Sequence, residues 1–136
     1  PHGTFFLRDE DRPRLFVAGG TGVAPFLSML RAMSQKARAQ PTTLLIGART
    51  HGHLFALEEL ETLRQASPNI QVRLAVEQDA DGDCHHGYAT DLIAGLGLDP
   101  ATRVYLCGPP PMVEAGRKAA EAAGLPRQDV LCERFA

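Results

Sequence analysis

Cysteine is scarce in this chain of 136 residues, and the three cysteines lie far apart. Cys84, Cys107 and Cys132 form no CxxC pair, so their spacing argues against a disulfide framework, a zinc ribbon and an iron–sulfur site within the chain. The sequence also shows no signal peptide. Unpaired cysteines are typical of proteins in a reducing compartment, so we expect a cytoplasmic location.

The chain also lacks an excess of either charge and any long hydrophobic run. Lys and Arg (14) nearly balance Asp and Glu (16), and the formal net charge is −2. That balance gives no electrostatic reason to expect binding to nucleic acid or to an anionic membrane. No apolar run approaches the ~18 residues needed to cross a bilayer. With 44% hydrophobic residues, the composition is that of one globular domain.

Short apolar runs alternate with helical patterns along the chain. The predicted strands lie at residues 15–18, 42–48, 70–76, 104–107 and 130–132. The predicted helices lie at residues 23–38, from Leu57 to the Ser67-Pro68 stop, at residues 91–96 behind a Thr90 N-cap, and from Met112 to Gly124. This alternation predicts an α/β fold, a doubly wound parallel sheet of five strands in the order 3-2-1-4-5 with helices on both faces.

A glycine-rich loop follows the first predicted strand. It reads Gly19-Gly20-Thr21-Gly22-Val23-Ala24-Pro25 and leads into a helix. Glycine lets a ligand approach the backbone, and a helix N-terminus offers free N–H groups to a phosphate. Pro25 stands where the dinucleotide fingerprint has its third glycine. On its own, therefore, the loop fits either a phosphate cradle or a tight turn without a ligand.

A second unusual loop, Cys107-Gly108-Pro109-Pro110-Pro111-Met112, follows the fourth predicted strand. Alone it fits a rigid connector beside a buried cysteine. In the predicted strand order, however, the first and fourth strands are neighbours. The crevice at the carboxyl ends of such strands is where doubly wound sheets bind ligands. The two loops together therefore predict a dinucleotide site.

These two motifs, in this order and separation, resemble the pyridine-nucleotide domain of the ferredoxin–NADP reductase superfamily. The resemblance includes the terminal Glu133-Arg134-Phe135 and spans nearly the whole chain. It is strongest to the reductase components of bacterial aromatic-ring oxygenases, of the benzoate dioxygenase reductase type. Residues 1–11 look like the final strand of that family's flavin-binding barrel, which would leave residues 12–136 as the NAD(P)-binding domain.

The resemblance implies roles for individual residues. Gly20, Thr21 and Gly22 would face the pyrophosphate and nicotinamide, while Cys107 and Gly108 would line the hydride-transfer point. The implied catalytic residues are Cys107, Glu133 and Phe135, the last two meeting the flavin. The implied cofactor-binding residues are Gly19, Gly20, Thr21, Gly22, Pro25, Arg49, Thr50, Cys107, Gly108, Pro109, Pro110, Met112 and Phe135. Hydride passes directly between cofactors, so no acid–base residue is required.

The nucleotide is expected to be NADH, as in the oxygenase reductases, but NADPH stays open because of Arg49. This residue follows the second predicted strand, where the adenosine ribose is read; an acidic residue there favours NAD, whereas an arginine can accommodate a 2′-phosphate. The resemblance further implies FAD, a 2Fe–2S centre, and as partners a flavin domain, a ferredoxin domain or protein, and a terminal oxygenase. The chain itself has no Arg-x-Tyr-Ser flavin motif and no series of cluster-ligating cysteines. A stand-alone nucleotide-binding regulatory module is the alternative.

A polar loop at residues 79–87 invites a metal hypothesis, because three aspartates precede Cys84-His85-His86. The spacing fails for a calcium loop: Gly82 falls at position four instead of six, and Thr90 stands where the bidentate glutamate belongs. Adjacent cysteine and histidines also have poor zinc spacing. We therefore predict a solvated loop and no metal site.

Overall fold

The structure is a computed structural model that describes residues 12–32, 39–54 and 56–134, apart from the side chains of Thr21 and Arg134. The predicted barrel remnant, residues 1–11, and Phe135 lie outside the described residues. The division at residue 12 therefore stays a prediction. In the part of the chain that is described, no helix is long and apolar enough to cross a bilayer.

A six-stranded, wholly parallel sheet forms the centre of the molecule, in the order β4-β3-β2-β1-β5-β6. The strands are β1 (Arg14–Gly19), β2 (Thr42–Ala48), β3 (Ile70–Val76), β4 (His85–His86), β5 (Arg103–Gly108) and β6 (Val130–Arg134). The prediction of five strands is wrong by one, because β4 lies in the segment predicted as a loop. A strand of two residues is too short to show a pattern of alternating hydrophobicity in the sequence. It forms only because the chain folds back beside the end of β3. The other five strands follow the predicted order.

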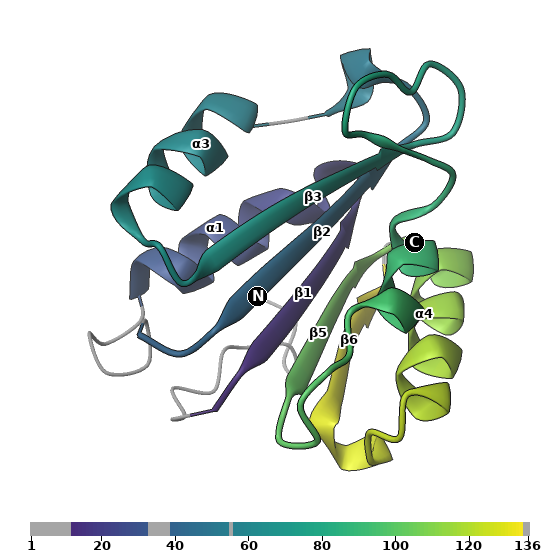
Figure 1. Cartoon of the computed structure of the whole chain (residues 1–136). Helices are drawn as coiled ribbons and strands as arrows, with labels where there is room; N and C mark the ends of the chain where they lie inside the picture. Colours follow the sequence, from purple (N-terminus) through teal and green to yellow (C-terminus); the bar gives the residue numbers. More distant parts are fainter. Residues whose placement is uncertain (1–11, 33–38, 55, 135–136) are drawn as a thin grey trace.

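Helices cover both faces of the sheet, as predicted (Figure 1). Helices α1 (Val23–Ala32) and α3 (Leu57–Ala66) lie on one face, and α4 (Pro110–Ala122) lies on the other with the 3-10 helix η3 (Ala89–Gly95). Three shorter 3-10 helices are η1 (Gly20–Gly22), η2 (His51–His53) and η4 (Arg127–Asp129). The predicted extension of the first helix through residues 33–38 lies outside the described residues.

The sheet side chains divide between two cores by strand alternation. Phe16 points to the α1 side, where its ring stacks on Phe26 at a centroid distance of 4.7 Å and tilts against Tyr105 at 5.0 Å. Leu15 and Val17 point to the α4 side. Both neighbours of β1 are strands and both of its faces are covered, so its side chains at residues 15–18 are fully buried. This explains why its sequence is a continuous apolar run.

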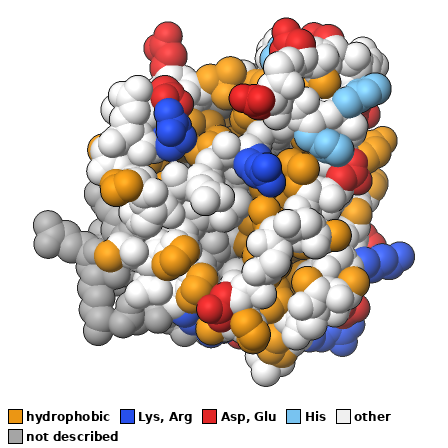
Figure 2. Space-filling view, in the orientation of Figure 1, with side chains coloured by type: hydrophobic (Ala, Val, Ile, Leu, Met, Phe, Trp, Pro, Cys, Tyr) orange, Lys and Arg blue, Asp and Glu red, His pale blue; other side chains and the backbone are white. Residues whose placement is uncertain are grey.

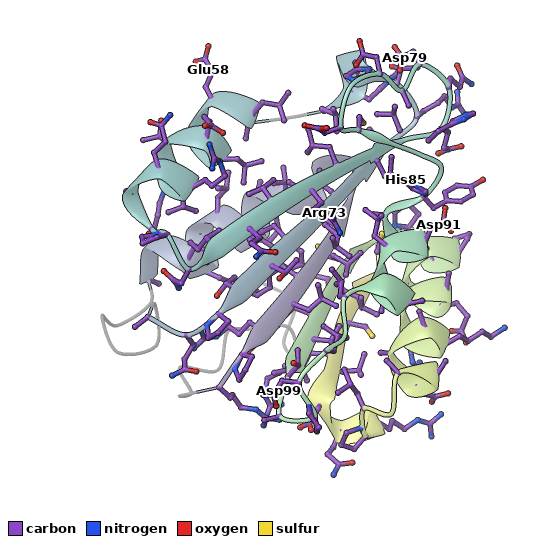
Figure 3. All side chains as sticks on the ribbon, viewed as in Figure 1. Glu58, Arg73, Asp79, His85, Asp91 and Asp99 are labelled. Carbon is purple, nitrogen blue, oxygen red and sulfur yellow. The ribbon has the colours of Figure 1, made fainter. Side chains whose placement is uncertain are left out.

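The alternating strand β3 has one less covered face, as its pattern predicts. Arg73 pairs in register with Leu45, which places it on the α4 side of the sheet, where it is exposed. Figure 3 shows its side chain over the middle of the sheet. The third predicted helix differs in its start. It is the 3-10 helix η3, and its N-cap is Tyr88 instead of Thr90, because the Tyr88 N–H donates to Asp91 Oδ2 at 2.8 Å.

Candidate functional site

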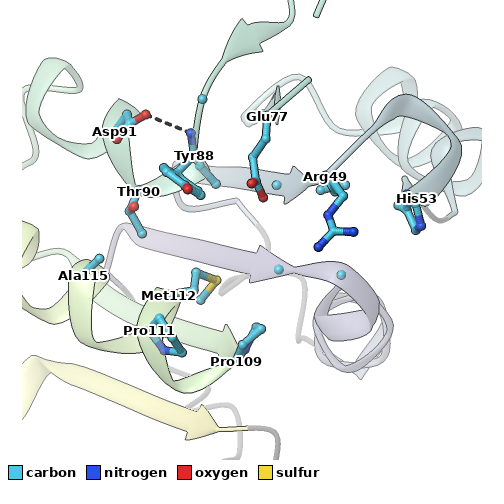
Figure 4. A pocket seen from close by; sticks show the side chains of 16 residues that line it. Arg49, His53, Glu77, Tyr88, Thr90, Asp91, Pro109, Pro111, Met112 and Ala115 are labelled. Atoms are coloured by element: carbon cyan, nitrogen blue, oxygen red, sulfur yellow. Dashed lines mark hydrogen bonds between the residues drawn. The ribbon is translucent and has the colours of Figure 1, made fainter. Parts of the chain in front are cut away.

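A pocket of about 650 Å3 opens at the carboxyl ends of β1, β2, β3 and β5 (Figure 4). It lies on the side of the sheet covered by η3 and α4, both of which contribute to its wall. The lining residues are Gly19, Gly20, Gly47, Ala48, Arg49, His53, Glu77, Gly87, Tyr88, Ala89, Thr90, Asp91, Pro109, Pro111, Met112 and Ala115. Its position is the switch point at which the sheet order reverses, where open α/β sheets bind ligands.

The two predicted motif loops pack backbone against backbone at this edge. A Cβ added to Gly22 would collide with the carbonyl oxygen of Cys107. A Cβ on Gly19 would come within 2.8 Å of the Met112 Sδ atom, and so would one on Gly108. Close packing of backbone between the loops therefore requires a glycine at position 22, whereas at positions 19 and 108 the flexible Met112 side chain would have to shift.

Gly20 is favoured for a different reason. Its φ of +59° lies in the left-handed region, and a Cβ there would meet nothing within 4 Å. The backbone thus turns sharply into η1 and then into the N-terminus of α1, with open space above the turn. Free N–H groups and the positive end of a helix dipole meet at such a point, and this combination attracts phosphate.

The opposite wall of the pocket is polar and comes from the ends of β2 and β3. Arg49 follows β2, and Glu77 follows β3. The N–H of Glu77 donates to the carbonyl oxygens of Ala48 at 3.2 Å and of Arg49 at 3.1 Å, so the two strand ends are tied together. Thr50, a predicted site residue, hydrogen-bonds through Oγ1 to His53 Nδ1 at 2.7 Å and does not itself line the pocket.

Cys107 lies outside the pocket lining. It pairs with Ala18 on β1 and points to the α1 side, where its side chain is fully buried in the core around Phe16. Desolvation raises the pKa of its thiol to about 12, and the charge of Glu133 adds to the shift. Glu133 stands directly opposite on β6. Cys107 is therefore a neutral thiol at ordinary pH, and Glu133 lies beside it on the neighbouring strand.

The structure brings together some predicted residues and leaves others apart. Gly19, Gly20, Arg49, Pro109 and Met112 line the pocket. The predicted residues that are described but do not line it are Pro25, Gly22, Thr50, Cys107, Gly108, Pro110 and Glu133. Phe135 and the Thr21 side chain lie outside the described residues.

Sequence reasoning missed Glu77, Tyr88, Thr90 and Asp91 as lining residues. Glu77 carried a usable signal, because it directly follows a predicted strand whose carboxyl end lies at the binding edge. The other three carried none, since they reach the pocket only because the loop after β3 folds back to form β4 and η3.

In and around the loop considered for metal binding, carboxylates lie beside histidine rings, which carry a charge only when protonated. His51 reaches Asp79 from Nδ1 and Asp81 from Nε2, each at 3.2 Å, and His85 Nε2 lies 3.2 Å from Asp91 Oδ2. In Figure 2, histidine side chains gather among acidic ones at the upper right, over this loop. Within the described ranges, no group of three His, Cys, Asp or Glu side chains is placed to hold a metal ion.

Comparison with known proteins agrees with this geometry. The family model for the oxidoreductase NAD-binding domain matches residues 16–118, from within β1 into α4. The chain belongs to the oxidoreductase NAD-binding domain family. The match includes both motif loops and every residue that lines the pocket.

Among curated relatives, the electron transfer component of toluate 1,2-dioxygenase from Pseudomonas putida is 37% identical over 138 residues, which cover 100% of this chain and 41% of the relative. The reductase component of propane 2-monooxygenase from Mycolicibacterium smegmatis is 35% identical over 143 residues, covering 99% of this chain and 41% of the relative. The NAD-binding domain thus spans less than half the length of these relatives.

A solved structure, the cytochrome P450 reductase GcoB of Amycolatopsis, superposes on this NAD-binding domain with a TM-score of 0.85 at 26% identity. The superposition covers 93% of this chain and 38% of the other. The predicted resemblance to ferredoxin–NADP reductase-like oxygenase reductases is therefore confirmed. The predicted nicotinamide nucleotide, which the family shares, is confirmed at the level of the domain.

Proposed function

We propose that this domain positions NADH or NADPH for hydride transfer to FAD within a longer reductase that feeds electrons to an oxygenase. The observation that carries the proposal is the meeting of the two motif loops beside a pocket at the switch point of the sheet. The stand-alone regulatory module is less well supported, because both relatives described above are named as electron transfer or reductase components and are much longer than this chain.

The residues present fit a dinucleotide. Gly20 leaves open space above a sharp turn, so its backbone and the N-terminus of α1 would hold the phosphates. Pro109, Pro111 and Met112 provide an apolar wall and Arg49 and Glu77 a polar one, which suits a ligand with flat rings and sugar hydroxyls. When bound, the nicotinamide supplies a hydride, and the domain supplies orientation.

Cys107, Gly108, Glu133 and Phe135 remain our proposed residues at the flavin-facing edge. In support, Cys107 and Glu133 are paired across β5 and β6, and Gly22 abuts the Cys107 backbone. A buried, neutral thiol cannot act as a base or a nucleophile at ordinary pH. Its contribution would be steric: it fixes the position of the backbone against which the nicotinamide is held.

The wider setting is also proposed. Relatives of this domain serve a toluate dioxygenase and a propane monooxygenase. By analogy, FAD, a 2Fe–2S centre and an oxygenase would be supplied by parts of the complete protein and its partners. The free cysteines of the described residues suit a reducing cytoplasm.

The proposal is tested with the complete reductase. Mixed anaerobically with NADH in a stopped-flow spectrometer, the bound flavin should lose its visible absorbance in a single turnover. The 136-residue chain alone should bind nucleotide but remain colourless and reduce no dye. Stoichiometric FAD on this chain, or dye reduction by it, would contradict the proposed division of labour.

A further inference from the structure

The side chain of Met112 fills the space between the ends of the two central strands. It stands in the first turn of α4, is half-buried and lines the pocket. A Cβ built on Gly19 or on Gly108 would lie 2.8 Å from its Sδ atom, and one on Gly108 would also lie 3.0 Å from its Cε atom. The thioether therefore occupies the room that the two glycines leave at the ends of β1 and β5.

The same thioether is accessible from the pocket. Figure 4 shows the Met112 side chain reaching from α4 toward the end of β1. The pocket, at about 650 Å3, is far larger than a small oxidant such as hydrogen peroxide. Met29, in contrast, is buried in the core around Phe16, and the third methionine, Met33, lies outside the described residues. Of the two described methionines, Met112 is thus the one that a small oxidant can reach.

We propose that Met112 is a site of reversible oxidation and that its sulfoxide form weakens nucleotide binding. Hydrogen peroxide is the oxidant: an S–O bond forms at Sδ, the peroxide O–O bond breaks, and water leaves. The sulfur loses two electrons, and the peroxide is reduced by the same two. The effect on binding rests on the proposed nucleotide function of the pocket, whereas the modification itself does not.

The sulfoxide does not fit the space that the thioether fills. Its oxygen is added to a sulfur that is already packed against Gly19 and Gly108, so either the motif loops move apart or the oxygen projects into the pocket. Oxidation also makes an apolar side chain polar and adds a hydrogen-bond acceptor. Pro109 and Pro111, beside it in the pocket wall, have no N–H to donate to that acceptor. Its negative end would also repel phosphates held at the turn after β1.

The cysteines respond differently to peroxide. Cys107 is fully buried, and burial raises the pKa of its thiol to about 12, so the reactive thiolate is scarce. Cys84 and Cys132 are half-buried, and burial also raises the pKa of the Cys84 thiol. A small dithiol reverses disulfides and sulfenic acids, whereas methionine sulfoxide requires a methionine sulfoxide reductase. Treatment with dithiothreitol after peroxide therefore isolates the effect of methionine oxidation.

The test treats the 136-residue chain with hydrogen peroxide and then with dithiothreitol, and follows each methionine by peptide mass spectrometry. Met112 should gain one oxygen atom well before Met29 does. Calorimetric titration should then show NAD+ binding weakened by about tenfold or more. Methionine sulfoxide reductases for both epimers should restore the affinity. Saturating NAD+ during the treatment should slow the oxidation of Met112 and leave that of Met29 unchanged.

Three variants assign the effect to one sulfur atom. Met112→Leu removes the sulfur, so peroxide should not change its NAD+ affinity, whatever the starting value. Met29→Leu is the matched control, because Met29 is buried in the core, and it should lose affinity on oxidation as the unmodified chain does. Met112→Gln places an amide oxygen in this position without peroxide and should bind NAD+ more weakly than Met112→Leu. Thermal melting confirms that each variant is folded.

The outcomes separate this inference from the proposed function. If Met112 resists peroxide, or if its sulfoxide binds NAD+ as tightly as the thioether, the inference is wrong and the nucleotide function stands. The same holds if Met112→Leu loses as much affinity on oxidation as the unmodified chain. If the untreated chain shows a cooperative thermal transition but binds no NAD+, the proposed function and the effect on binding both fall. Mass spectrometry alone then decides the modification.

Discussion

Cys107 combines two properties at the scale of the single residue: complete burial, and a place in the loop that the nucleotide is proposed to contact. Truncation to alanine removes the sulfur from the core around Phe16. We expect Cys107→Ala to lower the unfolding free energy by about 1–2 kcal/mol. In the complete reductase it should also slow flavin reduction more than it weakens nucleotide binding, because a small misplacement at a reacting centre can cost ~100-fold.

Thermal melting and stopped-flow flavin reduction measure the two effects separately. Cys84→Ala, at a half-buried cysteine in the loop after β3, is the control and should change neither quantity appreciably. A Cys107→Ala reductase that is destabilised but keeps its flavin-reduction rate would restrict Cys107 to core packing.

The buried thiol of Cys107 should also make the unfolding free energy depend on pH. Its pKa rises on folding from an ordinary value of 9.0 to about 12. The folded chain therefore keeps a proton that the unfolded chain releases, so this contribution is complete below pH ~9 and is lost as the pH rises toward ~12. The unfolding free energy should fall by up to about 1.4 kcal/mol per pH unit in that window. Urea unfolding across it checks this, and Cys107→Ala should show a shallower slope; equal slopes would contradict the burial of the thiol.

The position of Arg49 in the pocket leads to a prediction about the preference between NADH and NADPH. By its resemblance to the oxygenase reductases, the complete reductase is expected to have a higher kcat/KM with NADH than with NADPH. Arg49→Ala should then lower kcat/KM for NADPH by about tenfold, through loss of attraction for the 2′-phosphate, while the value for NADH changes little. Steady-state kinetics with both nucleotides provide the check. A wild-type preference for NADPH that collapses in Arg49→Ala would show that the arginine dominates.

At the scale of elements, the turn from β1 into α1 contains two glycines with different demands. Gly22→Ala should destabilise the domain strongly and abolish nucleotide binding, because the new Cβ collides with backbone of the neighbouring motif loop. Gly20→Ala places its Cβ in open space and adds only the strain of a positive φ, about 1 kcal/mol. Melting temperatures and NAD+ titration of both variants test the contrast. Equal losses of stability would contradict the packing of the two loops.

Elements also show where sequence reasoning succeeds and fails. The alternation of polar and apolar residues in β3 and the continuous apolar run of β1 are local patterns that indicate a strand by themselves. Both strands were predicted. The strand β4 was not, because its two residues pair only after the chain folds back. The same fold-back carries Tyr88, Thr90 and Asp91 into the pocket. The glycine and proline loops were predictable because their chemistry is local. Side chains along β5 alternate between the two faces of the sheet, and this alternation directs Cys107 to the α1 side, away from the pocket.

At the scale of the whole molecule, the two edges of the sheet differ in what they offer. The carboxyl edge carries both motif loops and the larger pocket. The amino edge carries a smaller pocket of about 280 Å3, lined among others by Arg14, Thr42 and Gly97. The central claim is that the nucleotide binds at the carboxyl edge. Because glycines lie at both edges of the sheet, their amide groups can report at which edge the nucleotide binds.

Glycine amide signals from a 15N-labelled chain, titrated with NAD+ and followed by NMR, test that claim most directly. We predict that signals of the pocket glycines Gly19, Gly20, Gly47 and Gly87 shift together with one dissociation constant. Those of Gly97, at the amino edge, and Gly124, which follows α4, should stay in place. Shifts centred on Gly97, or no shifts in a folded chain at saturating nucleotide, would contradict the account.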